Sequence, residues 1–215
     1  MVAKLTAKKA SILTYFHDPM CSWCWGYRPV WQQLKAALPA AIEVQNVLGG
    51  LAPDSKEVMP LELQMQIQGY WRHIENTLGT TFNFDFWKNN QPCRATYKAC
   101  RAVLAAKNQG REEVMIEAIQ QAYYLRAMNP SDTAVLVQLA TEIGLHSGQF
   151  SDDLEAEKTY QQLAQQIDLT RAAPIAGFPS LVLEVAGQQL PVRVDYKDYR
   201  LTLAQIKAFS SDTIK

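Results

Sequence analysis

The stretch that decides the fold is "DPMCSWCWG", residues 18–26, which follows the segment "SILTYFH" at residues 11–17. The preceding segment is rich in β-branched and aromatic residues and short enough to be a buried strand. Cys21 and Cys24 stand two residues apart directly after it. On their own, these residues allow a redox pair, half of a metal site, or two buried sulfurs, so the interpretation depends on what surrounds them.

The residues after the cysteines predict a helix and then a second strand. Val30, Leu34 and Leu38 recur at helical spacing in the segment 27–39, which Pro39 ends. Residues 41–50 have the composition of a strand and close with two glycines. A strand, a helix and a strand in this order predict a βαβ unit with a parallel pair of strands.

The middle of the chain is predicted to be helical, and strands return only near the end. A hairpin is expected over residues 178–194, with its turn at Gly187, followed by a last helix over 199–209. The predicted fold is therefore a sheet domain of residues 1–52 and 169–215, interrupted by a helical insertion of residues 53–168. Five helices are expected in the insertion, at 60–78, 93–107, 112–128, 132–145 and 152–167, the last with Ser151 or Asp152 as its N-cap.

Composition and charge exclude several classes of protein. Apolar residues make up 48% of the chain, and 21 basic residues balance 21 acidic ones, so we expect no electrostatic binding of nucleic acid or of a membrane surface. No apolar run is long enough to span a bilayer, and residues 1–10 contain lysines without a following apolar signal region. We therefore expect a cytoplasmic protein, in which a special cysteine is catalytic, redox-sensing or metal-bound.

The position of the cysteine pair favours redox chemistry. At a strand-to-helix junction, Cys21 would lie at the helix N-terminus, where unpaired amides and the helix dipole stabilise a thiolate, and Cys24 would lie one turn inside. Cys21 could then attack a disulfide and Cys24 could resolve the mixed disulfide. Cys93 and Cys100 have six residues between them, which does not fit the spacing of zinc ligands, so we predict no metal site.

The segment "FHDPMCSWCWG" resembles the active site of the DsbA-like branch of the thioredoxin superfamily, in particular its cytosolic FrnE-like members. Pro29, the helical insertion and the segment "AGFPSLVLE" extend the resemblance over most of the chain. The resemblance implies an α/β thioredoxin-like fold, βαβ…ββα, with a large all-helical insertion. It also implies that Pro179 is cis and that Phe178 and Pro179 lie against the Cys21 sulfur, where the substrate backbone docks.

Two departures from the DsbA pattern concern proton transfer and redox strength. The dipeptide between the cysteines is Ser22-Trp23 and lacks the histidine of DsbA, and Tyr15 occupies the position of the buried acid in strongly oxidising members. His17 and Asp18 are the nearest candidates for an acid or base, although an Asp before a proline is also typical of a turn. The resemblance therefore implies a redox-active pair that is not a strong oxidant.

The remaining site predictions concern the surroundings of the pair. Ser22, Trp23 and Trp25 are expected to bind substrate together with Phe178 and Pro179, the tryptophans lining an apolar groove for unfolded polypeptide or an aromatic small molecule. Cys93 and Cys100, seven apart in a predicted helix, are expected to pack in the core. In the related proteins, however, the start of this helix approaches the active-site groove.

Three functions remain open from the sequence. The leading one is a thiol–disulfide oxidoreductase or isomerase acting on protein or small-molecule disulfides, with no cofactor other than glutathione as a candidate redox partner. The second is a glutathione-dependent transferase or isomerase of the kappa or hydroxychromene-carboxylate type, but these enzymes carry serine at the position of Cys21 and lack the resolving cysteine. The third is a non-enzymatic protein that binds a partner through its tryptophan-rich groove. Both a monomer and a homodimer are compatible with the sequence.

Overall fold

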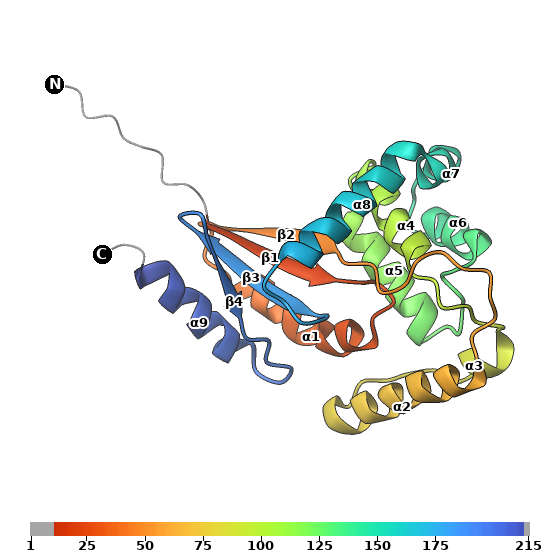
Figure 1. The fold of residues 1–215 in the computed structure, drawn as a ribbon, viewed down its shortest axis with the longest axis horizontal. Helices are drawn as coiled ribbons and strands as arrows, with labels where there is room; N and C mark the ends of the chain where they lie inside the picture. The colour runs from red at the N-terminus through yellow and green to blue at the C-terminus, as the bar shows by residue number, and fades with distance from the viewer. Residues whose placement is uncertain (1–10, 213–215) are drawn as a thin grey trace.

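The computed structural model describes residues 11–212, and a mixed sheet in the order β2–β1–β3–β4 forms its centre (Figure 1). β1 and β2 are parallel and are joined by α1, which runs from Ser22 to Ala37; β3 is antiparallel to β1, and β4 to β3. This topology confirms the predicted thioredoxin-like α/β fold. The strands are β1 (Ser11–His17), β2 (Ile42–Leu48), β3 (Ser180–Val185) and β4 (Gln188–Val192).

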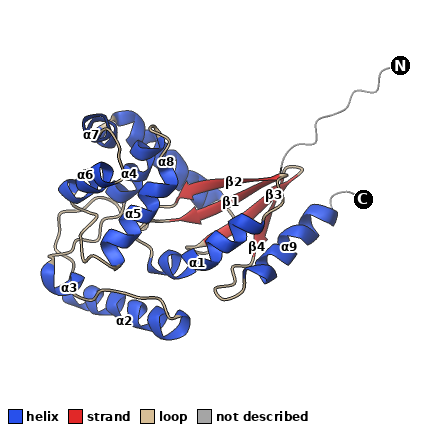
Figure 2. Cartoon of the chain, turned by 180° about the vertical axis from the view of Figure 1, so that it is seen from behind, coloured by secondary structure: helices blue, strands red, loops and turns tan. Residues whose placement is uncertain are grey.

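Helices cover both faces of the sheet. Leu13 and Tyr15 of β1 share a buried cluster with α1 and α9 (Tyr199–Asp212), while Phe16 points to the opposite face, as the period of two in a strand requires. α8 (Glu157–Ala172) lies against β2 on the side away from α1 (Figures 1 and 2). The carboxyl end of β1, where the cysteine pair begins, is therefore enclosed by protein on both faces.

The helical insertion has two parts. α4 (Tyr97–Lys107) is its central helix, with every residue from Ala99 to Ala106 buried against the other helices of the larger part. α2 (Leu61–Leu78) and the short α3 (Phe86–Asn89) form the smaller part, which packs on the carboxyl end of α5 through a buried aromatic cluster, and α2 also contacts α1 (Figure 1). The remaining helices are α5 (Glu112–Tyr124), α6 (Thr133–Glu142) and α7 (Ser147–Glu155).

Three details differ from the sequence prediction. The predicted helix over 152–167 is wrong: the chain forms α7 and α8, separated by Ala156 in an extended conformation, so that Phe150 and Leu154 of α7 enter the core from another direction than α8. His146, and not Ser151 or Asp152, caps α7. α3 was not predicted, because four residues are too few to show a helical period.

Cys93 lies outside α4, although the predicted helix began at this residue. It forms an isolated β-bridge with Val58, and α4 begins only at Tyr97. The division of the chain at residues 52 and 169 stays a prediction, although α8 continues past residue 168 to Ala172. The expectation about a signal region concerns residues 1–10, which lie outside the described part. Between residues 11 and 212, no helix is long and apolar enough to cross a membrane.

Candidate active site

Cys21 and Cys24 lie where the chain turns from β1 into α1. Cys21 is the N-cap residue of α1, and its sulfur accepts a hydrogen bond from the backbone N–H of Cys24 at 3.4 Å. The unpaired amides of the first helical turn favour a negative charge at this position. Both thiols are free; Cys21 is 5% exposed and Cys24 is completely buried. Cys21 is thus the more accessible thiol, with Cys24 behind it.

The loop before β3 brings Phe178 against Cys21. The Phe178–Pro179 peptide bond is cis, as the family resemblance implied. The Cys21 thiol donates a hydrogen bond to the backbone carbonyl oxygen of Phe178 at 3.6 Å. Gly49 follows β2 directly beneath the Phe178 ring, and a Cβ there would overlap that ring. The absence of a side chain at Gly49 therefore allows the Phe178 loop to approach Cys21.

The Asp18 carboxylate fixes the loop that carries the cysteines. It is completely buried and accepts hydrogen bonds from the backbone N–H groups of Met20 and Leu51, at 2.7 and 2.8 Å, and from the Thr96 hydroxyl at 2.6 Å. The Cys100 thiol donates a further, longer hydrogen bond of 3.6 Å. Burial raises the pKa of Asp18, and these donors oppose part of that effect. Asp18 thus lies in a turn, as its position before Pro19 suggested, and its carboxylate also joins three segments of the chain.

An apolar groove of about 210 Å³ opens in front of Cys21. It brings together the predicted residues Ser22, Trp23 and Phe178, but not Trp25 or Pro179. Trp25 instead stacks on Tyr124, with ring centroids 5.6 Å apart, and its indole N–H donates to the carbonyl of Thr81. The prediction that both tryptophans line one groove is therefore wrong for Trp25, because α1 turns that side chain toward the insertion.

The groove contains residues that were not predicted as part of the site. The far wall comes from α2 and from the segment before α4, which contributes Cys93 and Arg94. Cys93 is partly exposed, so the expectation that it packs in the core is wrong, while Cys100 is buried as expected. The sequence of α2 indicates such a wall, because this helix carries more apolar residues than its buried face needs. Leu61 and Met65 remain exposed.

Cys24 and its neighbours Tyr15 and His17 are buried, and burial favours the uncharged form of each. Burial raises the pKa of Cys24 and of Tyr15 well above their ordinary values. Burial also lowers the pKa of His17 to about 4. The His17 ring stacks on Tyr15 with centroids 4.8 Å apart, and neither ring nitrogen has a hydrogen-bond partner among the described residues. His17 is therefore a neutral imidazole near neutral pH.

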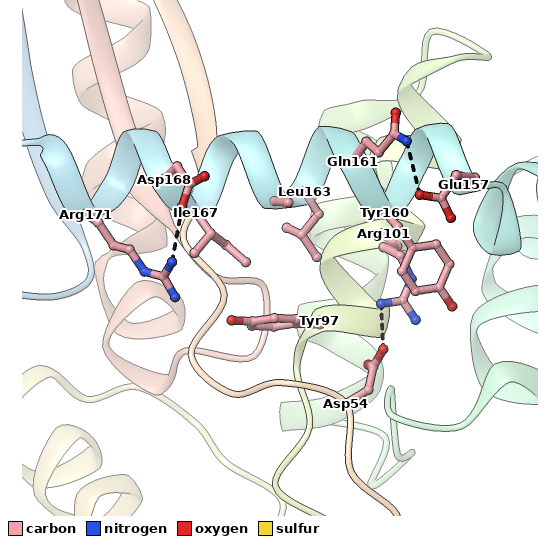
Figure 3. Close-up of a pocket in the computed structure, with 11 residues that line it drawn as sticks. Asp54, Tyr97, Arg101, Glu157, Tyr160, Gln161, Leu163, Ile167, Asp168 and Arg171 are labelled. Carbon is pink, nitrogen blue, oxygen red and sulfur yellow. Dashed lines mark hydrogen bonds and ion pairs between the residues drawn. The ribbon is translucent and has the colours of Figure 1, made fainter.

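A larger hollow of about 420 Å³ lies away from the cysteines, between α4, α8 and the segment after β2 (Figure 3). Arg101, buried in α4, forms an ion pair with Asp54 at 2.7 Å and faces the Tyr160 ring at 4.0 Å. At the other end, Arg171 pairs with Asp168. No predicted site residue lines this hollow. The Arg101–Asp54 ion pair holds the segment after β2 to the insertion, whereas the Arg171–Asp168 pair lies within α8. Among residues 11–212, no cluster of His, Cys, Asp or Glu side chains could hold a metal ion.

Comparison with known proteins agrees with this geometry. A family model described as Thioredoxin matches residues 15–195. The structure is similar to that of a candidate protein disulfide isomerase from Nitrosomonas europaea, with a TM-score of 0.82, 26% identity and coverage of 96% of this chain and 100% of that one. It is also similar to the cytosolic disulfide reductase DsbM from Pseudomonas aeruginosa, with a TM-score of 0.72, 24% identity and coverage of 94% and 98%. DsbM is known in a structure with glutathione.

A curated relative carries a different description. The ClpXP adapter protein SpxH of Bacillus subtilis is 23% identical over 207 residues, which cover 93% of this chain and 68% of that protein. The comparisons therefore confirm a DsbA-like thioredoxin fold, but they connect it both with disulfide chemistry and with an adapter role.

Replacing Asp18 by asparagine tests the anchor of the cysteine loop. The amide keeps the shape but has only one accepting oxygen, so its NH2 group faces a backbone N–H or the Thr96 hydroxyl. We expect the free energy of unfolding to fall by about 1–3 kcal/mol in urea denaturation. The exposed Asp152→Asn variant is the control, with an expected change below about 0.5 kcal/mol. Equal stability of the two variants would contradict the anchoring role.

The burial of neutral His17 predicts a pH-dependent stability. The folded-state pKa is about 4 and the ordinary value is 6.5, so the unfolded state binds the proton first as the pH falls. The contribution of His17 is fully present above pH 6.5 and is lost between about pH 6.5 and pH 4, amounting to about 3 kcal/mol. We expect the parent to lose this much more stability than His17→Phe between pH 7 and pH 4 in urea denaturation. A pH-independent difference between the two would show that His17 is not buried in this way.

Proposed function

The chain belongs to the thioredoxin family, and from that premise we propose that it is a thiol–disulfide oxidoreductase with Cys21 as nucleophile and Cys24 as resolving thiol. The observation that carries the proposal is the position of Cys21. Its sulfur lies at the N-terminus of α1, beside the Phe178 carbonyl and in the wall of an apolar groove. A substrate disulfide lying in that groove would meet Cys21 before the fully buried Cys24.

The reaction follows from the order of the two thiols. The Cys21 thiolate attacks one sulfur of the substrate disulfide, the substrate S–S bond breaks, and the departing substrate thiolate takes up a proton. Cys24 then loses its proton and attacks the Cys21 sulfur, which leaves a Cys21–Cys24 disulfide and releases the second substrate thiolate, which takes up a proton from solvent. The substrate has gained two electrons and two protons, and the protein has lost them.

We further propose that the protein works as a reductase or isomerase in the cytoplasm. Against a reducing glutathione pool, a pair that is not strongly oxidising is mostly a dithiol, which is the reactive form for both activities. The similarity to DsbM, described as cytosolic and known with glutathione, supports a small thiol as electron donor. Arg94 is the cation in the groove lining and could pair with a carboxylate of such a thiol or of a peptide.

The shape of the groove supports an extended polypeptide as substrate. Its walls combine Trp23 and Phe178 with apolar side chains of α2, and exposed apolar residues of α2 continue beyond it. Unfolded chains expose apolar side chains that such a surface can cover. The complete cysteine pair also argues against a glutathione transferase of the kappa type, because that chemistry does not need a resolving thiol.

A second candidate function is that of an adapter that binds another protein without redox chemistry. The observation that favours it is the similarity to SpxH, which extends over 93% of this chain. An adapter would use the same groove as a binding surface, and its binding would not depend on the Cys21 thiol. The two functions therefore differ in their response to a single-atom change at Cys21.

Insulin reduction with dithiothreitol as electron donor tests the leading proposal. We expect the parent to accelerate reduction, Cys21→Ser to abolish the acceleration because the nucleophile is lost, and Cys24→Ser to accumulate a mixed disulfide on Cys21. Cys100→Ser is the matched control, because it makes the same sulfur-to-oxygen change at a buried thiol that does not line the groove and it keeps a donor to Asp18; we expect it to remain active. Replacing dithiothreitol by glutathione then tests the natural class of donor.

Two results would overturn the redox assignment. One is a parent that does not accelerate insulin reduction. The other is a Cys21→Ser variant as fast as the parent, since sulfur exchange cannot occur at a serine. Retained binding of a partner protein by Cys21→Ser, together with either result, would favour the adapter function.

A further inference from the structure

The two cysteines open onto different cavities. Cys21 lines the front groove, whereas Cys24 lines a separate rear cavity of about 260 Å³. Four elements build the rear cavity: β1 contributes Tyr15 and His17, α1 contributes Cys24, β2 contributes Asn46, and α5 contributes Glu113 and others. The resolving thiol, although buried from the front, thus has a cavity of its own behind it.

His17 lines this cavity, and its ring nitrogens form no hydrogen bond that would support the fold in the described part of the chain. Both ring nitrogens are buried and lack a hydrogen-bond partner among the described residues, and so does Oε1 of Gln120 on the opposite wall. An unsatisfied buried polar group costs about 1–3 kcal/mol, so such groups are ordinarily satisfied by ordered water. A cavity of this size, with polar groups on several sides, has room for several water molecules.

The outer end of the rear cavity is charged and held in place. Glu113 accepts hydrogen bonds from Asn46 at 2.8 Å and from Lys35 at 2.9 Å, and its side chain is 53% exposed. Burial alone would raise the pKa of Glu113, but these hydrogen bonds and the charge of Lys35 lower it, so this carboxylate is ionised near neutral pH. Arg28 and Glu117 form a second ion pair beside it at 2.6 Å. The titratable and charged groups around His17 are therefore Tyr15, Cys24, Arg28, Lys35, Glu113 and Glu117.

The resolving step needs a route for a proton. Cys24 must become a thiolate to attack Cys21, and burial makes that charge unfavourable because it raises the pKa of Cys24. β1 has Tyr15, and not a carboxylate, beside Cys24. His17 is the nitrogen base that shares the rear cavity with this thiol, and a base can act through one bridging water molecule.

We propose that His17 relays the Cys24 proton, through water in the rear cavity, to solvent at the Glu113 end during resolution of the mixed disulfide. The inference rests on the proposed redox function and adds a proton-transfer residue to it. Glu113 and Lys35 act as positioning residues, because they hold the charged outer end of the route.

The proton balance of this step needs no additional reagent. Water takes the proton of the Cys24 thiol and passes it to one ring nitrogen of His17, while the other ring nitrogen releases a proton toward the outer water. Because the two transfers are coupled, the imidazole need not accumulate as a cation in its buried site. The Cys24 thiolate forms the bond to Cys21, and the bond from Cys21 to the substrate sulfur breaks with its electron pair on the substrate.

A chromogenic aryl disulfide, followed by stopped-flow absorbance, separates the two steps. Attack by Cys21 releases one coloured thiolate, and attack by Cys24 releases the second. The measurement uses a Cys93→Ala background, so that the partly exposed Cys93 does not react. His17→Phe keeps a ring that can stack on Tyr15 and removes both nitrogens, which form no hydrogen bond to any residue in the described part of the chain.

We expect His17→Phe to leave the first release unchanged and to slow the second by about 100-fold, the usual size of a general acid–base contribution. His17→Ala should show the same loss and regain part of the rate with added imidazole, which can enter the cavity. His146→Asn, which removes an exposed histidine and keeps an N-cap side chain for α7, is the control and should match the parent.

Three outcomes would overturn the relay. An unchanged second release in His17→Phe would show that His17 carries no proton. Equal slowing of both releases, without imidazole rescue, would show that it only supports the structure. If the parent itself gives no second release, the proposed redox function fails and the relay fails with it, a result that the variants cannot imitate.

Discussion

The buried Asp18 carboxylate is the interaction on which the site depends. Three parts of the chain that are distant in sequence meet at its two oxygens: the turn before Cys21, the segment after β2 at Leu51, and the start of α4 at Thr96. A buried carboxylate is tolerable only when such donors surround it. Because Thr96 belongs to the helical insertion, the Asp18 side chain ties the insertion to the cysteine loop, and so helps to position the segment before α4 as part of the far wall of the groove.

The two steps of the proposed reaction take place at sulfurs that face different cavities. The front groove gives Cys21 an apolar surface and the Phe178 carbonyl, which suits docking of a substrate chain. The rear cavity gives Cys24 polar neighbours and the unpartnered nitrogens of His17. The substrate would then reach Cys21 from one side and the proton would leave Cys24 on the other, so a bound polypeptide would not block the proton route.

The local features of the fold could be predicted from the sequence. Three features could be predicted because each depends on a short segment or on a family resemblance. They are the strand at residues 11–17, the cysteine pair at the start of α1 and the cis bond before Pro179. The separation of α7 from α8 at Ala156 could not be predicted, because the sequence has no Gly or Pro there. The neighbour of His17 in the rear cavity, Glu113, and the partner of Asp18, Thr96, could not be predicted either. Both reach the site only through packing of the insertion, which leaves no local pattern.

The most direct test of the account is the order in which the thiols react. The reduced protein is treated with less than one equivalent of iodoacetamide, and the modified cysteine is identified by peptide mass spectrometry. The account predicts modification at Cys21, with Cys24 and Cys100 protected by burial. Preferential modification of Cys24, or of Cys93 in place of Cys21, would contradict the assignment of Cys21 as the nucleophile.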